Sequence, residues 1–208
     1  MTETTLADLM RDGGWVMWLL LAASVAVVAV SIQRGLAIRR SQGSARRLLL
    51  AVRKGLQNGQ TVQELARRCT TLEGSVGRMV GAGLSRWAQG REETESHLEA
   101  VALAELRRLG RGLGVLAAVA MTAPLLGFLG TVTGMMASFG TIVDFGTSRP
   151  DLVAGGISEA LTTTAAGLVV ALPAQLLFQG LSARVDRIEG ELEAAANGLL
   201  DLLHHPTH

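Results

Sequence analysis

The sequence is poor in the residues that build disulfide-linked, metal-linked or ordinary soluble domains. Its 208 residues include one cysteine, Cys69, no tyrosine and only 3% aromatic residues. A single cysteine excludes an intramolecular disulfide framework and a cysteine-based zinc site. Charge is also scarce, at 18% of residues, whereas soluble chains carry about 25%. These absences disfavour a secreted disulfide scaffold and an average soluble domain.

Apolar residues and glycine take the place of the missing types. Hydrophobic residues make up 49% of the chain, there are 25 glycines, and the mean hydropathy is +0.34. So much apolar side chain excludes intrinsic disorder. The length allows one compact domain or one small membrane protein. The net charge of +1 gives no indication of nucleic-acid binding.

Three long stretches carry almost no charge. Residues 15–32 form an uncharged run of 18, residues 112–143 one of 32, and residues 152–183 a third of 32 in which Glu159 is the only ionisable side chain. About 20 helical residues cross the ~30 Å hydrocarbon core of a bilayer. Buried helices of a soluble protein are the alternative, but the remaining residues are too few to cover three of them. The sequence therefore predicts an all-α integral membrane protein with three spans.

The flanks of the first run favour an uncleaved anchor over a signal peptide. The preceding residues hold Glu3, Asp8 and Asp12 against Arg11, so the positive leader that a signal peptide needs is missing. Basic residues follow the run instead, and such residues mark the cytoplasmic side. They are Arg34, Arg39, Arg40, Arg46, Arg47, Arg53 and Lys54.

The distribution of charge predicts the topology. Residues 34–111 hold 15 Lys/Arg and 7 Asp/Glu, which places this loop in the cytoplasm and the N-terminus outside. Arg184 and Arg187 follow the third run, which places the C-terminus inside. The predicted order is a periplasmic N-terminus (1–14), transmembrane helix 1 (15–33), a cytoplasmic helical loop (34–111), a long helix with span 2 (112–143), a periplasmic turn (144–150), a long helix with span 3 (151–183), and a cytoplasmic helix and tail (184–208).

Helical periodicity continues outside the spans. Apolar residues at helical spacing predict helices over residues 44–69, with a break near Asn58 and Gly59, and over residues 91–111. The tail repeats apolar residues every three or four positions from Val185 to Leu202. We therefore expect spans 2 and 3 to extend into the cytoplasm as long helices. The stripe on the tail is a bundle seam or a membrane-surface helix, and the acidic polar face favours the seam.

Small residues indicate close packing between spans 2 and 3. Gly127, Gly130 and Gly134 lie in span 2, and Gly167 lies on a small-residue face of span 3. A hairpin closing between residues 144 and 151 sets Thr131 level with Thr164, and Pro124 nearly level with Pro173, where the prolines can kink the helices. The glycines either hold helices of one subunit together or let several subunits surround a narrow pore. These two interpretations are compatible.

Glu159 is the most unusual residue of the third run. It lies about 8 residues into the predicted helix, roughly 12 Å along the axis. A carboxylate in hydrocarbon is costly, so it faces an interior, a partner or water. The alternative is an interfacial residue near the outer surface. The hydroxyls of Thr131, Thr163 and Thr164 either bond their own helix backbone or hydrate a pore.

Two motifs resemble those of a known family. Residues 123–136 (APLLGFLGTVTGMM) resemble the second-span signature of the ExbB/TolQ proteins, and residues 156–168 (GISEALTTTAAGL) resemble the start of their third span. These proteins belong to the wider MotA/TolQ/ExbB proton-channel family. The order, spacing and topology of the spans agree over nearly the whole chain. The long cytoplasmic insertion of the flagellar branch is absent, which favours the ExbB/TolQ branch.

The resemblance implies a homopentamer in the bacterial inner membrane, with single-span partner helices of the ExbD/TolR type in its central pore. The family uses the proton-motive force for work in the cell envelope, commonly through a TonB- or TolA-like protein. By the motif, Glu159, Thr131 and Thr164 match pore-lining positions, and Thr163 competes with Thr164. The resemblance leaves open whether Glu159 carries protons or tunes the path of an aspartate on the partner.

The sequence leaves two other classes of function. A non-conducting scaffold would use the glycines only to pack helices while it assembles a partner complex. A membrane enzyme is disfavoured, because the sequence shows no nucleophile–base pair, metal-ligand cluster or phosphate loop. We therefore predict no catalytic residue, no metal and no cofactor. The expected contacts are further copies of the chain, the single-span partner and membrane lipid, without nucleic acid.

Overall fold

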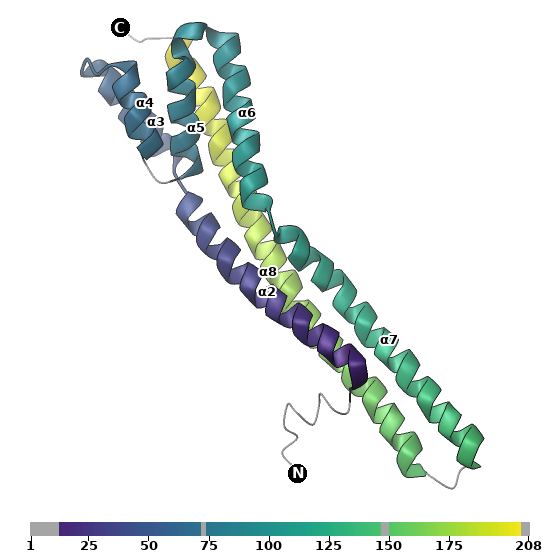
Figure 1. Ribbon diagram of the computed structural model, residues 1–208. Coiled ribbons are helices and arrows are strands. Elements are labelled where there is room, and N and C mark those ends of the chain that lie inside the picture. Colours follow the sequence, from purple (N-terminus) through teal and green to yellow (C-terminus); the bar gives the residue numbers. More distant parts are fainter. Residues whose placement is uncertain (1–12, 72–73, 147–149, 205–208) are drawn as a thin grey trace. The chain divides into compact units, whose positions relative to one another are not determined.

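The computed structural model describes residues 13–71, 74–146 and 150–204, and the regular structure in these ranges is helical (Figure 1). The prediction of an all-α protein is confirmed for these residues. Most of the predicted N-terminal segment 1–14, and part of the predicted turn 144–150, lie outside them. The helices are α2 (Gly14–Ser41), α3 (Ala45–Gln57), α4 (Val62–Thr71), α5 (Ser75–Arg86), the short η1 (Trp87–Gln89), α6 (Arg91–Gly110), α7 (Leu113–Phe145) and α8 (Pro150–His204).

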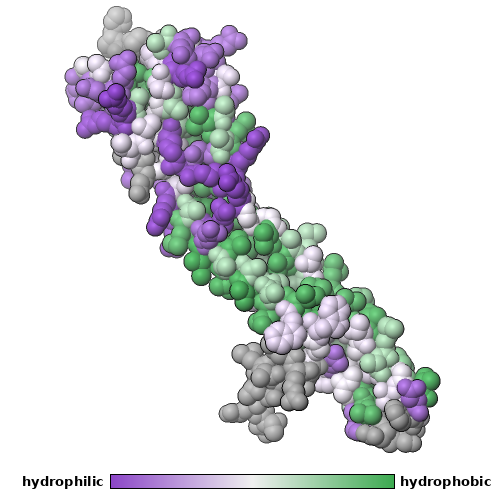
Figure 2. Space-filling model, in the orientation of Figure 1, coloured by the Kyte–Doolittle hydropathy of each residue, from purple (hydrophilic) through white to green (hydrophobic). Residues whose placement is uncertain are grey.

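The chain divides into two compact units. The apolar unit comprises residues 1–32 and 112–179, and the polar unit comprises residues 33–111 and 180–208. Helices α2, α7 and α8 are long and apolar enough to cross a membrane, as the three charge-free runs predict. Hydrophobic residues cover most of the visible face of the apolar unit, and hydrophilic residues gather over the polar unit (Figure 2).

The polar unit forms its core around α5 and the end of α8. An added Cβ at Gly83 of α5 would lie 2.7 Å from Leu98 of α6 and 2.9 Å from Leu199 of α8, so glycine lets three helices meet. The acidic tail of α8 buries its apolar stripe here, with Ile188, Leu192 and Leu199 at most 3% exposed. The structure thus agrees with a bundle seam and not with a membrane-surface helix.

The extension of span 2 is interrupted at the glycines between residues 110 and 114. Helix α6 ends at Gly110, Arg111 has extended ψ, and Gly112 adopts a left-handed φ of 81° before α7 begins. Only glycine adopts this conformation at little cost, so the chain turns there. The extension of span 3 is continuous, because α8 runs for 55 residues without an interruption. Pro124 and Pro173 both lie inside their helices.

A carboxylate on α6 organises the polar unit beside α5. Glu105 accepts hydrogen bonds from Nε and Nη2 of Arg78 at 2.9 and 2.7 Å, from Ser75 at 2.9 Å and from Arg108 at 2.8 Å. Burial alone would raise the pKa of Glu105, but the hydrogen bonds and the nearby arginine charges together lower it. Hydrogen bonding to Glu105 also raises the pKa of Arg78.

Replacing Glu105 with Gln is expected to destabilise the polar unit by about 1.5–3 kcal/mol, because hydrogen bonds to a charged acceptor are lost. Since folding lowers the pKa of Glu105, its contribution is present above the ordinary carboxyl pKa and is lost as the pH falls through the folded-state value. Thermal unfolding between pH 7 and pH 3 should therefore show a weaker acid dependence in Glu105→Gln. Glu99→Gln, an exposed position on the same helix, is the control and should behave as wild type.

Candidate functional site

Helices α7 and α8 of the apolar unit pack together through backbone rather than large side chains. An added Cβ at Gly127 would lie 2.9 Å from the Thr163 carbonyl oxygen, and one at Gly134 would lie 2.8 Å from that of Gly156. An added Cβ at Gly167 would lie 2.6 Å from the Ala123 carbonyl oxygen. All of these glycines are buried except Gly156, which is half-buried. The small residues therefore let the two backbones approach within one chain.

Polar side chains close the same seam. The Thr164 hydroxyl donates to the Gly127 carbonyl at 3.1 Å, and the buried Ser138 hydroxyl donates to the Val153 carbonyl at 3.1 Å. Thr163 is fully buried against Gly130, and its hydroxyl also bonds carbonyls of α8 itself. The bonds of Thr164 and Ser138 join the two helices, and such bonds stabilise the pairing of membrane-spanning helices.

The pairing of the two helices is shifted from the predicted one. Thr164 meets Gly127, about one helical turn from Thr131, with which it was expected to be level. The hydroxyl of Thr131 instead donates to the Phe128 carbonyl of its own helix at 2.6 Å. Symmetry about the turn gave the expected alignment, whereas the fit of glycines against opposing backbone sets the observed one. Gly156, which the sequence analysis did not single out, takes part in this fit.

The Glu159 side chain is not among the atoms nearest to the seam glycines Gly127, Gly130 and Gly134 of α7. Its carboxyl is next to Gly14, so closely that an added Cβ at Gly14 would collide with Oε1, and the residue is half-buried. Gly14 begins α2, immediately before the first apolar run. The carboxyl is therefore level with the N-terminal end of that run. No sequence signal marked Gly14, because it precedes the run.

Replacing Thr164 with Val is expected to weaken the α7–α8 pairing by about 0.6–1.7 kcal/mol, because a hydrogen bond between helices in lipid is worth roughly that much. Thr131→Val removes a hydroxyl of the same size that bonds only within α7, and is the matched control. Thermal unfolding in detergent measures the difference. Equal midpoints for the two variants would show that the Thr164 bond does not hold the helices together.

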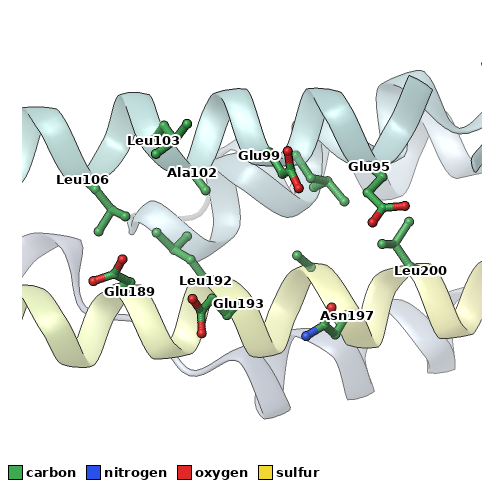
Figure 3. A pocket seen from close by; sticks show the side chains of 12 residues that line it. Glu95, Glu99, Ala102, Leu103, Leu106, Glu189, Leu192, Glu193, Asn197 and Leu200 are labelled. Atoms are coloured by element: carbon green, nitrogen blue, oxygen red, sulfur yellow. The ribbon is translucent and has the colours of Figure 1, made fainter. Parts of the chain in front are cut away.

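A groove in the polar unit runs between α6 and the end of α8. It has a volume of about 430 Å³ and is lined by apolar residues such as Leu106, Leu192 and Leu200, with glutamates at its edges. Figure 3 shows these leucines between the two helices, with Glu95, Glu189 and Glu193 beside them. An exposed apolar floor of this kind is a surface to which another protein chain can bind. Among the described residues, no cluster of His, Cys, Asp or Glu has the arrangement to hold a metal.

Comparison with known proteins identifies the relatives of this chain. Residues 71–194 match the family described as the MotA/TolQ/ExbB proton channel family. The Tol-Pal system protein TolQ of Pseudomonas aeruginosa is 31% identical over 93% of this chain and 88% of its own length. A putative biopolymer transport protein, ExbB-like 1, of a Synechocystis species is 35% identical over 87% of this chain and 72% of its own length. A putative ExbB homologue of Methanothermobacter thermautotrophicus is 28% identical, over 88% of this chain and 64% of its own length.

Proposed function

Because the chain belongs to the MotA/TolQ/ExbB proton channel family, a family of membrane channels and not of enzymes, we propose that it is the channel subunit of an ExbB/TolQ-type complex. In this proposal the complex couples the proton-motive force to work in the cell envelope, of the kind that energises transport across an outer membrane. The observation that carries the proposal is the one ionisable side chain of the third apolar run, Glu159, which is half-buried with its carboxyl next to Gly14 of α2.

The proposed proton path begins at Glu159 and continues along the hydroxyls of α7 and α8. Glu159 is level with the N-terminal end of α2, which is the outer end in the proposed topology, and we propose it as the proton acceptor at the outer mouth. Thr131 is half-buried at the edge of the seam and Thr164 lies about five residues deeper than Glu159, roughly 7.5 Å along the helix. Thr163 is fully buried against Gly130, so Thr164 fits a pore-facing role better.

Several copies of the chain are proposed to surround the path. Less than a third of the apolar window of each candidate span is buried within one subunit. Large side chains such as Phe128, Met136 and Leu161 are at least 65% exposed, so lipid or other subunits must cover them. From the family we carry over an inner-membrane complex of five copies. In this arrangement the N-terminus lies outside, the C-terminus lies inside, and an ExbD/TolR-like helix occupies the pore.

Two measurements test this proposal. The first is the mass of the detergent-purified complex, with and without its co-purifying partner, for which five copies are expected. The second is proton flux into liposomes that contain the chain alone or the complex, for which flux is expected with the partner. A complex that supports envelope function but conducts no protons in either form would favour the alternative, a non-conducting scaffold that assembles a partner complex.

A further inference from the structure

Four arginines surround one cavity in the polar unit, next to the places where the chain leaves the first apolar run and enters the second. The cavity has a volume of about 410 Å³, in the range of small-ligand sites. Its lining includes Arg34 and Arg40 of α2, Arg78 of α5 and Arg108 of α6. Helices from three separate parts of the sequence thus bring positive charge to one place.

The positive charges in this cavity are only partly neutralised by the described residues. Arg78 and Arg108 share a single carboxylate, that of Glu105. Arg108 also reaches the Ser41 hydroxyl at 3.5 Å, which adds no negative charge. The Nε of Arg34 is buried and has no hydrogen-bond partner within the described part of the chain. A buried donor without a partner is costly, so an anion that accepts its hydrogen bond would stabilise the site.

The position along the chain suits a ligand at the membrane surface. Arg34 comes two residues after the uncharged run 15–32 ends, about 3 Å along the helix, and Arg40 lies about 12 Å beyond that end. The polar headgroup layer extends about 5–8 Å beyond the hydrocarbon core on each side. Arginine side chains reach several ångströms along a helix to meet such a layer. A lipid phosphate would therefore lie between the two arginines of α2.

We propose that this arginine cavity binds a phosphate-bearing anion, through Arg34 and Arg40 as the charges that Glu105 does not neutralise. The phosphate comes either from the headgroup of an anionic membrane lipid or from a soluble phosphate compound. The proposal goes beyond proton conduction, because none of these arginines belongs to the α7–α8 seam or contacts Glu159.

The test compares ligand binding in the detergent-purified full chain. The probes are phosphatidylglycerol in neutral detergent micelles, phosphatidylcholine as the zwitterionic reference, and inorganic phosphate as a competitor, with bound lipid counted by native mass spectrometry. Arg34→Gln/Arg40→Gln removes the two charges and spares the pair with Glu105. Arg39→Gln/Arg46→Gln removes two exposed arginines of the same segment and is the matched control.

We expect phosphatidylglycerol to bind to Arg34→Gln/Arg40→Gln about tenfold more weakly than to wild type. The affinity of the control variant should lie within about twofold of the wild-type value. If the glutamine variant loses phosphatidylglycerol binding, and phosphate does not displace this lipid from wild type, the cavity is a lipid site. Binding of phosphate to wild type but not to the variant, without a preference for phosphatidylglycerol, identifies a soluble ligand. Equal binding by wild type and the variant overturns the site.

A charge-preserving variant guards against misfolding. Arg34→Lys/Arg40→Lys retains both charges but loses the planar guanidinium, and it is expected to bind the anion a fewfold more weakly than wild type. If the glutamine variant does not accumulate, the measurements on wild type alone test the proposal. The proposal is overturned if wild type neither binds phosphate nor prefers phosphatidylglycerol over phosphatidylcholine. Proton flux is measured separately, so loss of the anion site and loss of conduction are distinguishable.

Discussion

Replacing Glu159 with Ala is expected to abolish proton flux and coupled transport while the oligomer stays intact. Glu159 is the only ionisable group in residues 152–183, so no neighbouring carboxyl in this run can replace it as a proton acceptor. The atoms nearest to the glycines that hold α7 and α8 together belong to other residues, so we expect the seam to survive removal of the Glu159 side chain. A proton that crosses ~100 mV releases about 2.3 kcal/mol, and this driving force is lost to the complex when the path is closed.

The variants for this experiment separate charge from shape. Glu159→Gln preserves the size of the side chain and its ability to form hydrogen bonds, but an amide does not take up and release protons near neutral pH. We therefore expect it to abolish proton flux as completely as Glu159→Ala. Asp144→Asn removes an exposed carboxylate near the end of α7 and should retain flux. Proton flux in liposomes with the partner and the mass of the complex are the two measurements. Full flux in both Glu159 variants would remove this residue from the mechanism.

The spans and their special residues could be predicted from sequence because lipid imposes simple rules. Runs without charge marked the three helices, and α7 and α8 begin or end within a few residues of the predicted limits. Glu159 was recognisable because an ionisable residue stands out against an apolar run. The apolar stripe of the tail predicted the seam of the polar unit for the same reason, since its period of three or four residues is that of a helix.

Features that depend on contacts between distant residues could not be predicted. Helix α5 contains three glycines, which disfavour a helix in isolation, yet Gly81 and Gly83 let Thr70, Leu98 and Leu199 approach from other helices. The alignment of α7 with α8 follows the fit of Gly167 against the backbone of α7, which no count of residues from the turn gives. The proximity of Glu159 to Gly14, and the arginine cavity, likewise join segments that are far apart in the sequence.

Replacing Gly167 with Ala is expected to destabilise the apolar unit even though alanine favours helices. The added Cβ would lie 2.6 Å from the Ala123 carbonyl oxygen and 3.1 Å from the Gly127 Cα, and both are backbone atoms that no side-chain rotation can move. Overpacking of this kind costs about 1–3 kcal/mol, more than the ~1 kcal/mol that alanine gains over glycine in a helix. We expect a fall of roughly 5 °C in the unfolding midpoint, and failure of Gly167→Leu to accumulate.

Gly155→Ala is the matched control, because Gly155 lies on the same helix and an added Cβ there meets nothing within 4 Å in the described residues. It should unfold at the wild-type temperature or slightly above, since only the helix propensity changes. Unfolding in detergent, followed by circular dichroism, measures both variants. If Gly167→Ala proves as stable as Gly155→Ala, the close backbone approach of α7 and α8 does not hold the apolar unit together. The pairing of α7 and α8 would then depend on contacts with neighbouring subunits. Substitutions in the seam would in that case change the mass of the complex and not the stability of one chain.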